Sequence, residues 1–155
     1  MQNRMELTFL SRAQNEAFAR VAVAAFVVQL NPTLPEMADV KTAVSEAVTN
    51  AIVHGYAGRE DGLVKVEASY DDAQTLTVSV ADSGCGIADI ATAMLPFYST
   101  GNGAERSGMG FCVMQTFMDA VEVSSVVGEG TTVLMRKRIA GESALRRERL
   151  LDEIG

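Results

Sequence analysis

Two short polar motifs in this chain contain residue types that can do chemistry at a useful spacing. Glu46 and Asn50 stand four residues apart in a segment with helical periodicity, so one carboxylate and one amide oxygen project from the same helix face. A carboxylate can accept a proton, and an amide oxygen is a ligand for a hard cation. Farther along, Asp82 ends an alternating apolar run, and Gly84 and Gly86 after it allow the backbone to approach a planar ring closely.

A third motif supplies a candidate phosphate site. Gly108 and Gly110 precede an apolar run at residues 111–118, so free backbone N–H groups at a helix start could face phosphate oxygens. The chain has neither the Gly-x-x-x-x-Gly-Lys-Ser/Thr loop nor the strand lysine and His-Arg-Asp loop of protein kinases. The phosphates of a nucleotide would therefore not be held in a Walker-type cradle.

The elements that must position these motifs follow from periodicity and capping. Two capping patterns, at residues 11–14 and 33–36, predict helices that run to about residues 30 and 53. Alternating apolar residues predict strands, and a further helix is expected at about residues 109–119. We therefore predict an α+β fold, a two-layer α/β sandwich with helices on one face of a mixed, mostly antiparallel sheet. The predicted strands are residues 6–10, 63–70, 75–81, 121–127 and 131–138.

Length and charge narrow the class of protein. With 155 residues, of which 48% are hydrophobic and 21% charged, the chain fits one domain, predicted at residues 1–140. Residues 141–155 have mixed charges at helical spacing and are predicted to form an exposed helix. The net charge of -7 argues against nucleic acid as a partner. No apolar run is long enough to span a bilayer, so a cytoplasmic protein is expected.

The three motifs, in this order and spacing, resemble the ATP-binding superfamily of gyrase, Hsp90, histidine kinases and MutL. The helix of Glu46 and Asn50 resembles its N box, residues 82–86 its first glycine box, and residues 108–110 its second. Within that superfamily the chain is similar to the serine-kinase anti-sigma factors. The similarity covers residues 5–139 and is carried by residues 18–20, 44–56, 105–111 and 128–133.

The resemblance implies a role for each site residue and a nucleotide, ATP or ADP, as cofactor. Glu46 would be the general base, and Asn50 would hold Mg²⁺ through its side-chain oxygen. Asp82 would accept a hydrogen bond from the adenine amino group, which selects ATP over GTP. Thr49 and Thr131 would lie near the adenine and its bound waters. Residues 94–107 would form a lid over the ATP.

The resemblance also implies partners. A homodimer would sequester an RNA polymerase sigma factor, sigma F, during sporulation. It would also phosphorylate a serine of an anti-anti-sigma protein, which in its unphosphorylated form displaces the sigma factor. Arg20, Glu105 and Arg106 match positions that the family uses for these partners. Two alternatives stay open from the sequence: a stress-response switch kinase for another sigma factor, and a non-catalytic sigma-binding module that retains ATP. The presence of Glu46 argues against the second.

Overall fold

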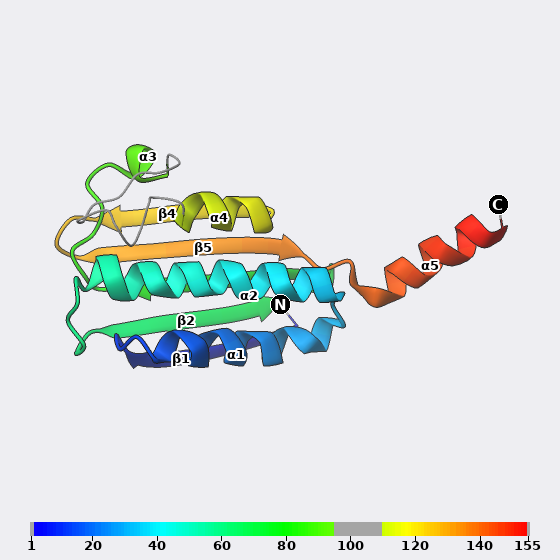
Figure 1. Ribbon diagram of the computed structural model, residues 1–155, viewed down its shortest axis with the longest axis horizontal. Coiled ribbons are helices and arrows are strands. Elements are labelled where there is room, and N and C mark those ends of the chain that lie inside the picture. The colour runs from blue at the N-terminus through cyan, green and yellow to red at the C-terminus, as the bar shows by residue number, and fades with distance from the viewer. Residues whose placement is uncertain (1, 95–109, 155) are drawn as a thin grey trace.

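The chain forms a five-stranded sheet with helices on one face, which confirms the predicted two-layer sandwich (Figure 1). The computed structural model describes residues 2–94 and 110–154, apart from the side chains of residues 143–145. The four strand pairings that order the sheet are all antiparallel. In spatial order the strands are β1 (Asn3–Leu10), β2 (Leu63–Tyr70), β3 (Thr75–Asp82), β5 (Gly130–Arg138) and β4 (Ala120–Val126).

Helices α1, α2 and α4 cover the inner face of this sheet (Figure 1). Alternate strand residues point toward them, and the valines of α2 complete an apolar core, because side chains repeat every two residues in a strand and every three to four in a helix. The helical segments are α1 (Asn15–Val27), η1 (Val28–Leu30), α2 (Leu34–Thr49), η2 (Asn50–Gly55), α3 (Ile90–Ala93), α4 (Gly110–Phe117) and α5 (Gly141–Ile154). The fully buried core includes Val40, Val44, Val48, Val64, Val66, Leu76, Val78, Met114 and Met135.

The first helix begins later than predicted, and its capping pattern is wrong. The hydroxyl of Ser11 donates to the Arg59 carbonyl and accepts from the Gly62 amide at 3.1 Å, and α1 starts only at Asn15 without a side-chain cap. Ser11 is 2% exposed and ties the end of β1 to the loop before β2. The Ser11 hydroxyl therefore makes long-range hydrogen bonds instead of capping α1 as the local sequence predicts.

The second capping pattern is confirmed and does more than begin α2. The Thr33 hydroxyl accepts from the Glu36 amide at 3.2 Å, and the Glu36 carboxylate accepts from the Thr33 amide at 3.0 Å. The same carboxylate accepts from the amides of Ala140 and Gly141, at 2.7 and 3.0 Å. Glu36 thus fixes the chain as it leaves β5 against the start of α2. The division of the chain at residue 140 stays a prediction.

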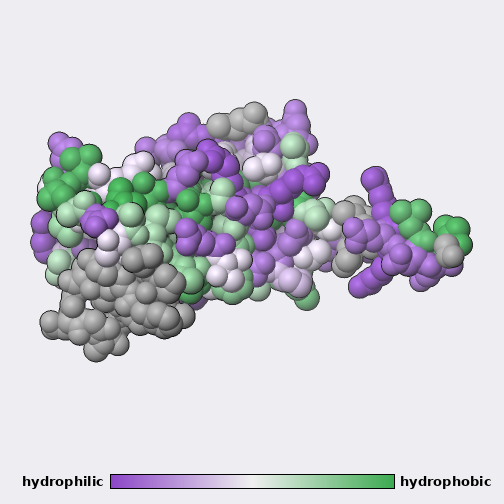
Figure 2. Space-filling view, turned by 90° about the horizontal axis from the view of Figure 1, so that it is seen from above, coloured by the Kyte–Doolittle hydropathy of each residue, from purple (hydrophilic) through white to green (hydrophobic). Residues whose placement is uncertain are grey.

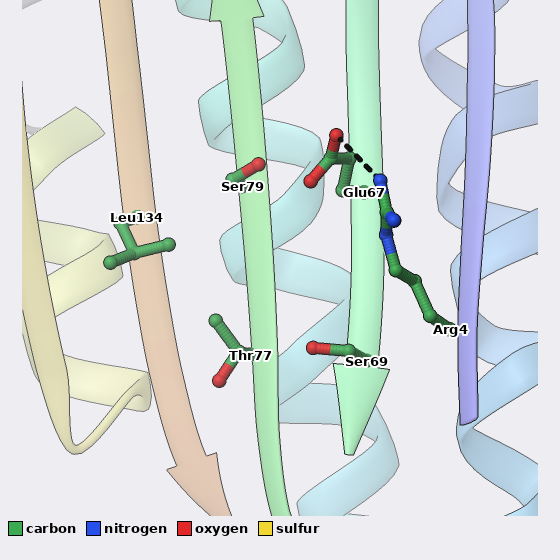
Figure 3. Close-up of a pocket in the computed structure, with 6 residues that line it drawn as sticks. All are labelled: Arg4, Glu67, Ser69, Thr77, Ser79 and Leu134. Carbon is green, nitrogen blue, oxygen red and sulfur yellow. Dashed lines mark hydrogen bonds and ion pairs between the residues drawn. The ribbon is translucent and has the colours of Figure 1, made fainter. Parts of the chain in front are cut away.

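The outer face of the sheet is polar. Arg4 and Lys65 form ion pairs with Glu6 and Glu67 at 2.6 to 3.3 Å across β1 and β2. Beside them is a shallow hollow over β2, β3 and β5, on the side of the sheet away from the helices (Figure 3). The hollow is lined by Arg4, Glu67, Ser69, Thr77, Ser79 and Leu134, so it includes none of the residues predicted for a nucleotide site.

Candidate functional site

The end of α2 holds the first group of predicted site residues. Glu46 and Asn50 are half-buried one turn apart, and the backbone N–H of Asn50 donates to the carbonyls of Glu46 and Ala47. At Asn50 the helix changes from α to π, and η2 then continues to Gly55. Widened turns of this kind recur at functional sites because they redirect side chains without ending the helix. The sequence predicted a plain helix to about residue 53 and missed this change.

Thr49 lies between these two residues in the chain but is engaged within its own helix. Its hydroxyl donates to the Ser45 carbonyl at 2.7 Å, and the side chain is half-buried. A hydroxyl held in this way keeps its oxygen lone pairs as acceptors. The position of Thr49 near a bound adenine stays a prediction.

Asp82 ends β3, and its carboxylate lies against Gly55 at the end of η2. A Cβ atom placed on Gly55 would lie 2.8 Å from the Asp82 carboxylate oxygen Oδ1, so a larger residue there would displace the carboxylate. Oδ1 also accepts from the Gly84 amide at 2.9 Å. Burial raises the pKa of the Asp82 carboxyl above its ordinary value, and hydrogen bonds from the amides of Gly84 and Thr131 offset this only in part. The carboxylate is thus a poorly solvated acceptor that a further hydrogen-bond donor would stabilise.

The glycines after Asp82 pack too tightly for any side chain. A Cβ on Gly84 would lie 1.9 Å from the Gly55 carbonyl oxygen, and the Cys85 amide donates to that same oxygen at 2.8 Å. Gly86 has a φ of +76°, and a Cβ there would lie 2.4 Å from the Val126 carbonyl oxygen. The turn is therefore fixed between η2 on one side and the end of β4 on the other.

Thr131 lies opposite Asp82 in the register of β3 and β5. It is 8% exposed, and its hydroxyl oxygen lies 2.8 Å from that of Ser125. Ser125 in turn accepts from the Ile87 amide at 2.7 Å, just after the glycine turn. The structure thus places Thr131 beside Asp82 and adds Ser125 to the same polar cluster. The position of Thr131 near a bound adenine stays a prediction.

Gly110 brings the third motif to the first. A Cβ placed on Gly110, where α4 begins, would lie 2.9 Å from the Asn50 side-chain nitrogen Nδ2 and 3.1 Å from its oxygen Oδ1. The Asn50 amide group is therefore packed against the start of α4. Gly108, Glu105, Arg106 and the predicted lid beyond residue 94 lie outside the described residues.

Tyr56 is a site residue that the sequence analysis missed. Its ring is 4% exposed, and its hydroxyl accepts from the Ser83 amide at 2.7 Å while donating to the Leu63 carbonyl. The ring fills the space beside Gly62, where a Cβ would lie 2.5 Å from a ring carbon. Tyr56 therefore holds the residue that follows Asp82. Its sequence signal is weak, because an aromatic residue at a helix end is more often plain core.

Arg20, the predicted partner residue on α1, is 37% exposed at its side chain and forms an ion pair with Glu16 at 3.3 Å. The same Glu16 oxygen accepts from the Ser45 hydroxyl of α2. Arg20 is thus linked through Glu16 to the helix that carries Glu46. The partner role of Arg20 stays a prediction.

The donor set suits a cation that is shared with a bound phosphate. Within residues 2–94 and 110–154, no group of three or more His, Cys, Asp or Glu side chains could enclose a metal ion. Asn50 offers one amide oxygen next to the helix start of α4. Mg²⁺ commonly takes one or two protein ligands and completes its shell with phosphate oxygens and water, so a site of this kind fits it.

The fold and the site define the class of protein. The family described as histidine kinase-like ATPase domain matches residues 9–137. Similar solved structures include the RsbU and RsbW domains of a Mycobacterium tuberculosis protein, with a TM-score of 0.66 and 19% identity over 89% of this chain and 33% of that chain. The catalytic domain of histidine kinase ThkA has a TM-score of 0.55 and 15% identity over 86% of this chain and 97% of that chain. These likenesses show the fold.

Relatives of higher identity narrow the class. The anti-sigma F factor of Clostridium beijerinckii is 58% identical over 136 residues, which are 88% of this chain and 94% of the relative. That of Halalkalibacterium halodurans is 49% identical over 145 residues, 94% of this chain and 99% of the relative. The chain belongs to the family of anti-sigma F factors, within the histidine kinase-like ATPase domains. In the part of the chain that the structure describes, no helix is long and apolar enough to cross a membrane.

Proposed function

We propose that the chain is an anti-sigma factor and protein serine kinase. It binds and inhibits a sigma factor, sigma F, and uses ATP to phosphorylate a serine of an anti-anti-sigma protein. One observation carries the proposal: three segments that are far apart in the sequence meet around η2. Asp82 lies against Gly55 at one end of η2, and Gly110 lies against Asn50 at the other.

This arrangement supports a site with two ends. The adenine would lie at the glycine turn, where its amino group donates to Asp82, near Thr131 and Thr49. The phosphates would point toward Asn50 and the start of α4, whose free amide groups favour anions; Gly108 would extend that cradle. Mg²⁺ held by Asn50 would neutralise charge on the phosphates.

The chemical step needs a base near the acceptor serine. Glu46 lies one turn before Asn50 on α2, so its carboxylate would take the proton of the serine hydroxyl as that oxygen bonds to the γ-phosphorus of ATP. The bond between the γ-phosphorus and the bridging oxygen breaks, and ADP leaves with that oxygen. The chain supplies positioning and proton transfer in this step.

The partner proposals rest on the family. The relatives at 49% to 58% identity are named anti-sigma F factors, which favours sigma F over the sigma factor of a stress-response switch. Arg20 on α1, together with Glu105 and Arg106, would bind the sigma factor and the anti-anti-sigma protein. A homodimer in the cytoplasm of a sporulating cell would be the active form.

A transfer assay tests the proposal. The purified protein is mixed with sigma F, an anti-anti-sigma protein and ATP labelled in its γ-phosphate. We expect the label on a serine of the anti-anti-sigma protein, and a complex with sigma F that forms with ATP present. Sigma binding without label transfer would support the non-catalytic module instead, and neither activity would reject both.

A further inference from the structure

Helix α5 lies outside the matched family domain, and the bonds that join its described residues to the body of the protein lie at its base. The family match ends at residue 137, and α5 begins at Gly141. Beside the bonds to Glu36, the Glu142 amide donates to the Asn31 carbonyl at 3.0 Å. Gly141 has a φ of +81° and is buried. These bonds fix the direction in which the helix leaves, and it extends away from the sheet and the other helices (Figure 1).

The far half of α5 exposes large apolar side chains. Leu150 is 57% exposed, Leu151 68% and Ile154 82%, and positions 150, 151 and 154 share one side of a helix. Figure 2 shows this apolar cluster at the end of the projecting helix, bordered by hydrophilic residues. The helix points away from its own domain, so the domain cannot cover this apolar cluster. Only another molecule could do so.

The charges on α5 indicate which molecule that is. Arg146 lies one turn before Leu150, and Glu153 lies nearly one turn after it on the same side. Across the helix as a whole the charges of both signs are mixed, whereas helices that bind anionic lipid surfaces carry a basic face. A cation on one side of the apolar centre and an anion on the other is a self-complementary arrangement when two copies run antiparallel.

We infer that α5 pairs antiparallel with α5 of a second copy of this chain, with the two-fold axis beside Leu150. In that register Arg146 of each copy faces Glu153 of the other. A single helix of 14 residues buries less than the roughly 1,200 Å² of a stable interface, so the contact is weak by itself. It would act beside any other contact between the two copies.

Disulfide cross-linking of the full-length chain tests this pairing directly. Leu150→Cys places a thiol beside the proposed axis and should give a cross-linked pair of chains under mild oxidation. Glu142→Cys is the matched control on the same helix. In the antiparallel pair the two copies of position 142 would lie at opposite ends, too far apart to cross-link. Native Cys85 and Cys112 set the background in the unsubstituted protein. Equal cross-linking of the two variants would overturn the proposal.

Charge exchange tests the orientation. In the Leu150→Cys chain, either Arg146→Glu or Glu153→Arg puts like charges opposite each other and should lower the cross-linked yield roughly threefold or more. Mixing these two variants should restore the yield, and so should both changes in one chain, because each case restores opposite charges. Circular dichroism checks that every variant keeps its helix. A yield that does not respond to charge exchange would contradict the antiparallel pairing.

Discussion

At the scale of single residues, Asp82 tests the choice of nucleotide. Asp82→Asn keeps an oxygen acceptor for the Gly84 amide, but its amide group can turn and no longer presents a fixed acceptor to adenine. We expect ATP binding to weaken by about 1 to 3 kcal/mol, measured by calorimetry. Because burial raises the pKa of Asp82 and so disfavours its charged form, the neutral variant should fold at least as stably.

The control for this experiment is Asp61→Asn, since Asp61 is an exposed loop residue paired only with Arg59 in the described part of the chain. It should bind ATP as the unchanged protein does. If Asp82→Asn also binds ATP with unchanged affinity, Asp82 is not part of the nucleotide site.

A substitution at Asn50 tests whether this residue holds Mg²⁺. Its side chain is the amide group packed against the start of α4, and Asn50→Ala removes that oxygen while keeping a good helix former. We expect the Mg²⁺ dependence of ATP binding to disappear in a titration of affinity against Mg²⁺. A variant whose ATP affinity still rises with Mg²⁺ would place the metal ligand elsewhere.

At the scale of elements, Gly110 tests whether α2 and α4 share one site. In Gly110→Ala the new methyl group would meet the end of the Asn50 side chain at 2.9 Å, and this flexible end would have to move. Alanine also favours a helix over glycine by up to about 1 kcal/mol. We therefore expect unchanged or higher thermal stability, with ATP affinity in the presence of Mg²⁺ lower by roughly tenfold.

Gln115→Ala is the matched change on the exposed side of the same helix. It should raise helix propensity without affecting ATP binding. An equal affinity in Gly110→Ala and Gln115→Ala would mean that Asn50 and the start of α4 do not act together on the nucleotide.

Glu36 joins two elements and makes stability depend on pH. Burial acts to raise the pKa of Glu36, but the amides of Thr33, Gly141 and Ala140 and the Thr33 hydroxyl together lower it below its ordinary value. Glu36 therefore contributes stability above the pKa of the unfolded chain, and loses it as the pH falls through the lower, folded pKa. Glu36→Ala should cost about 1 to 2 kcal/mol of unfolding free energy near neutral pH.

Denaturant unfolding at a series of pH values measures the difference in unfolding free energy between the unchanged protein and Glu36→Ala. This difference should become smaller as the pH falls. Glu60→Gln serves as control, because Glu60 is exposed and its ion pair with Arg12 spans 3.9 Å. If Glu36→Ala lowers the unfolding free energy by the same amount at every pH, the charge of the Glu36 carboxylate does not stabilise the contact between α2 and the end of β5.

At the scale of the whole molecule, the sequence predicted the sandwich because its strands and helices depend on local patterns. The residues expected at the site came from the resemblance to a family, and their roles stay predictions, although the structure brings Asp82 and Gly110 to the two ends of η2. Period-two alternation gave the strands, and Thr33 to Glu36 gave the start of α2. Ser125 and Tyr56 were missed because their roles depend on the pairing of β4 with β5 and on the return of Ser83 toward η2. Ser11 was misassigned for the same reason: its partners are more than forty positions away in the chain.

We propose that in this protein proton transfer to Glu46 and the binding of ATP and sigma factor depend on different residues. Glu46→Gln keeps the size of the side chain but removes its basic carboxylate, so phosphorylation of the anti-anti-sigma serine should fall by roughly 10²-fold or more. The assay measures label transfer from ATP alongside ATP affinity and sigma binding in the same preparation. We predict that both binding activities persist while transfer is lost. A variant that phosphorylates normally would contradict the account, and one that loses ATP and sigma binding together would show that Glu46 is structural.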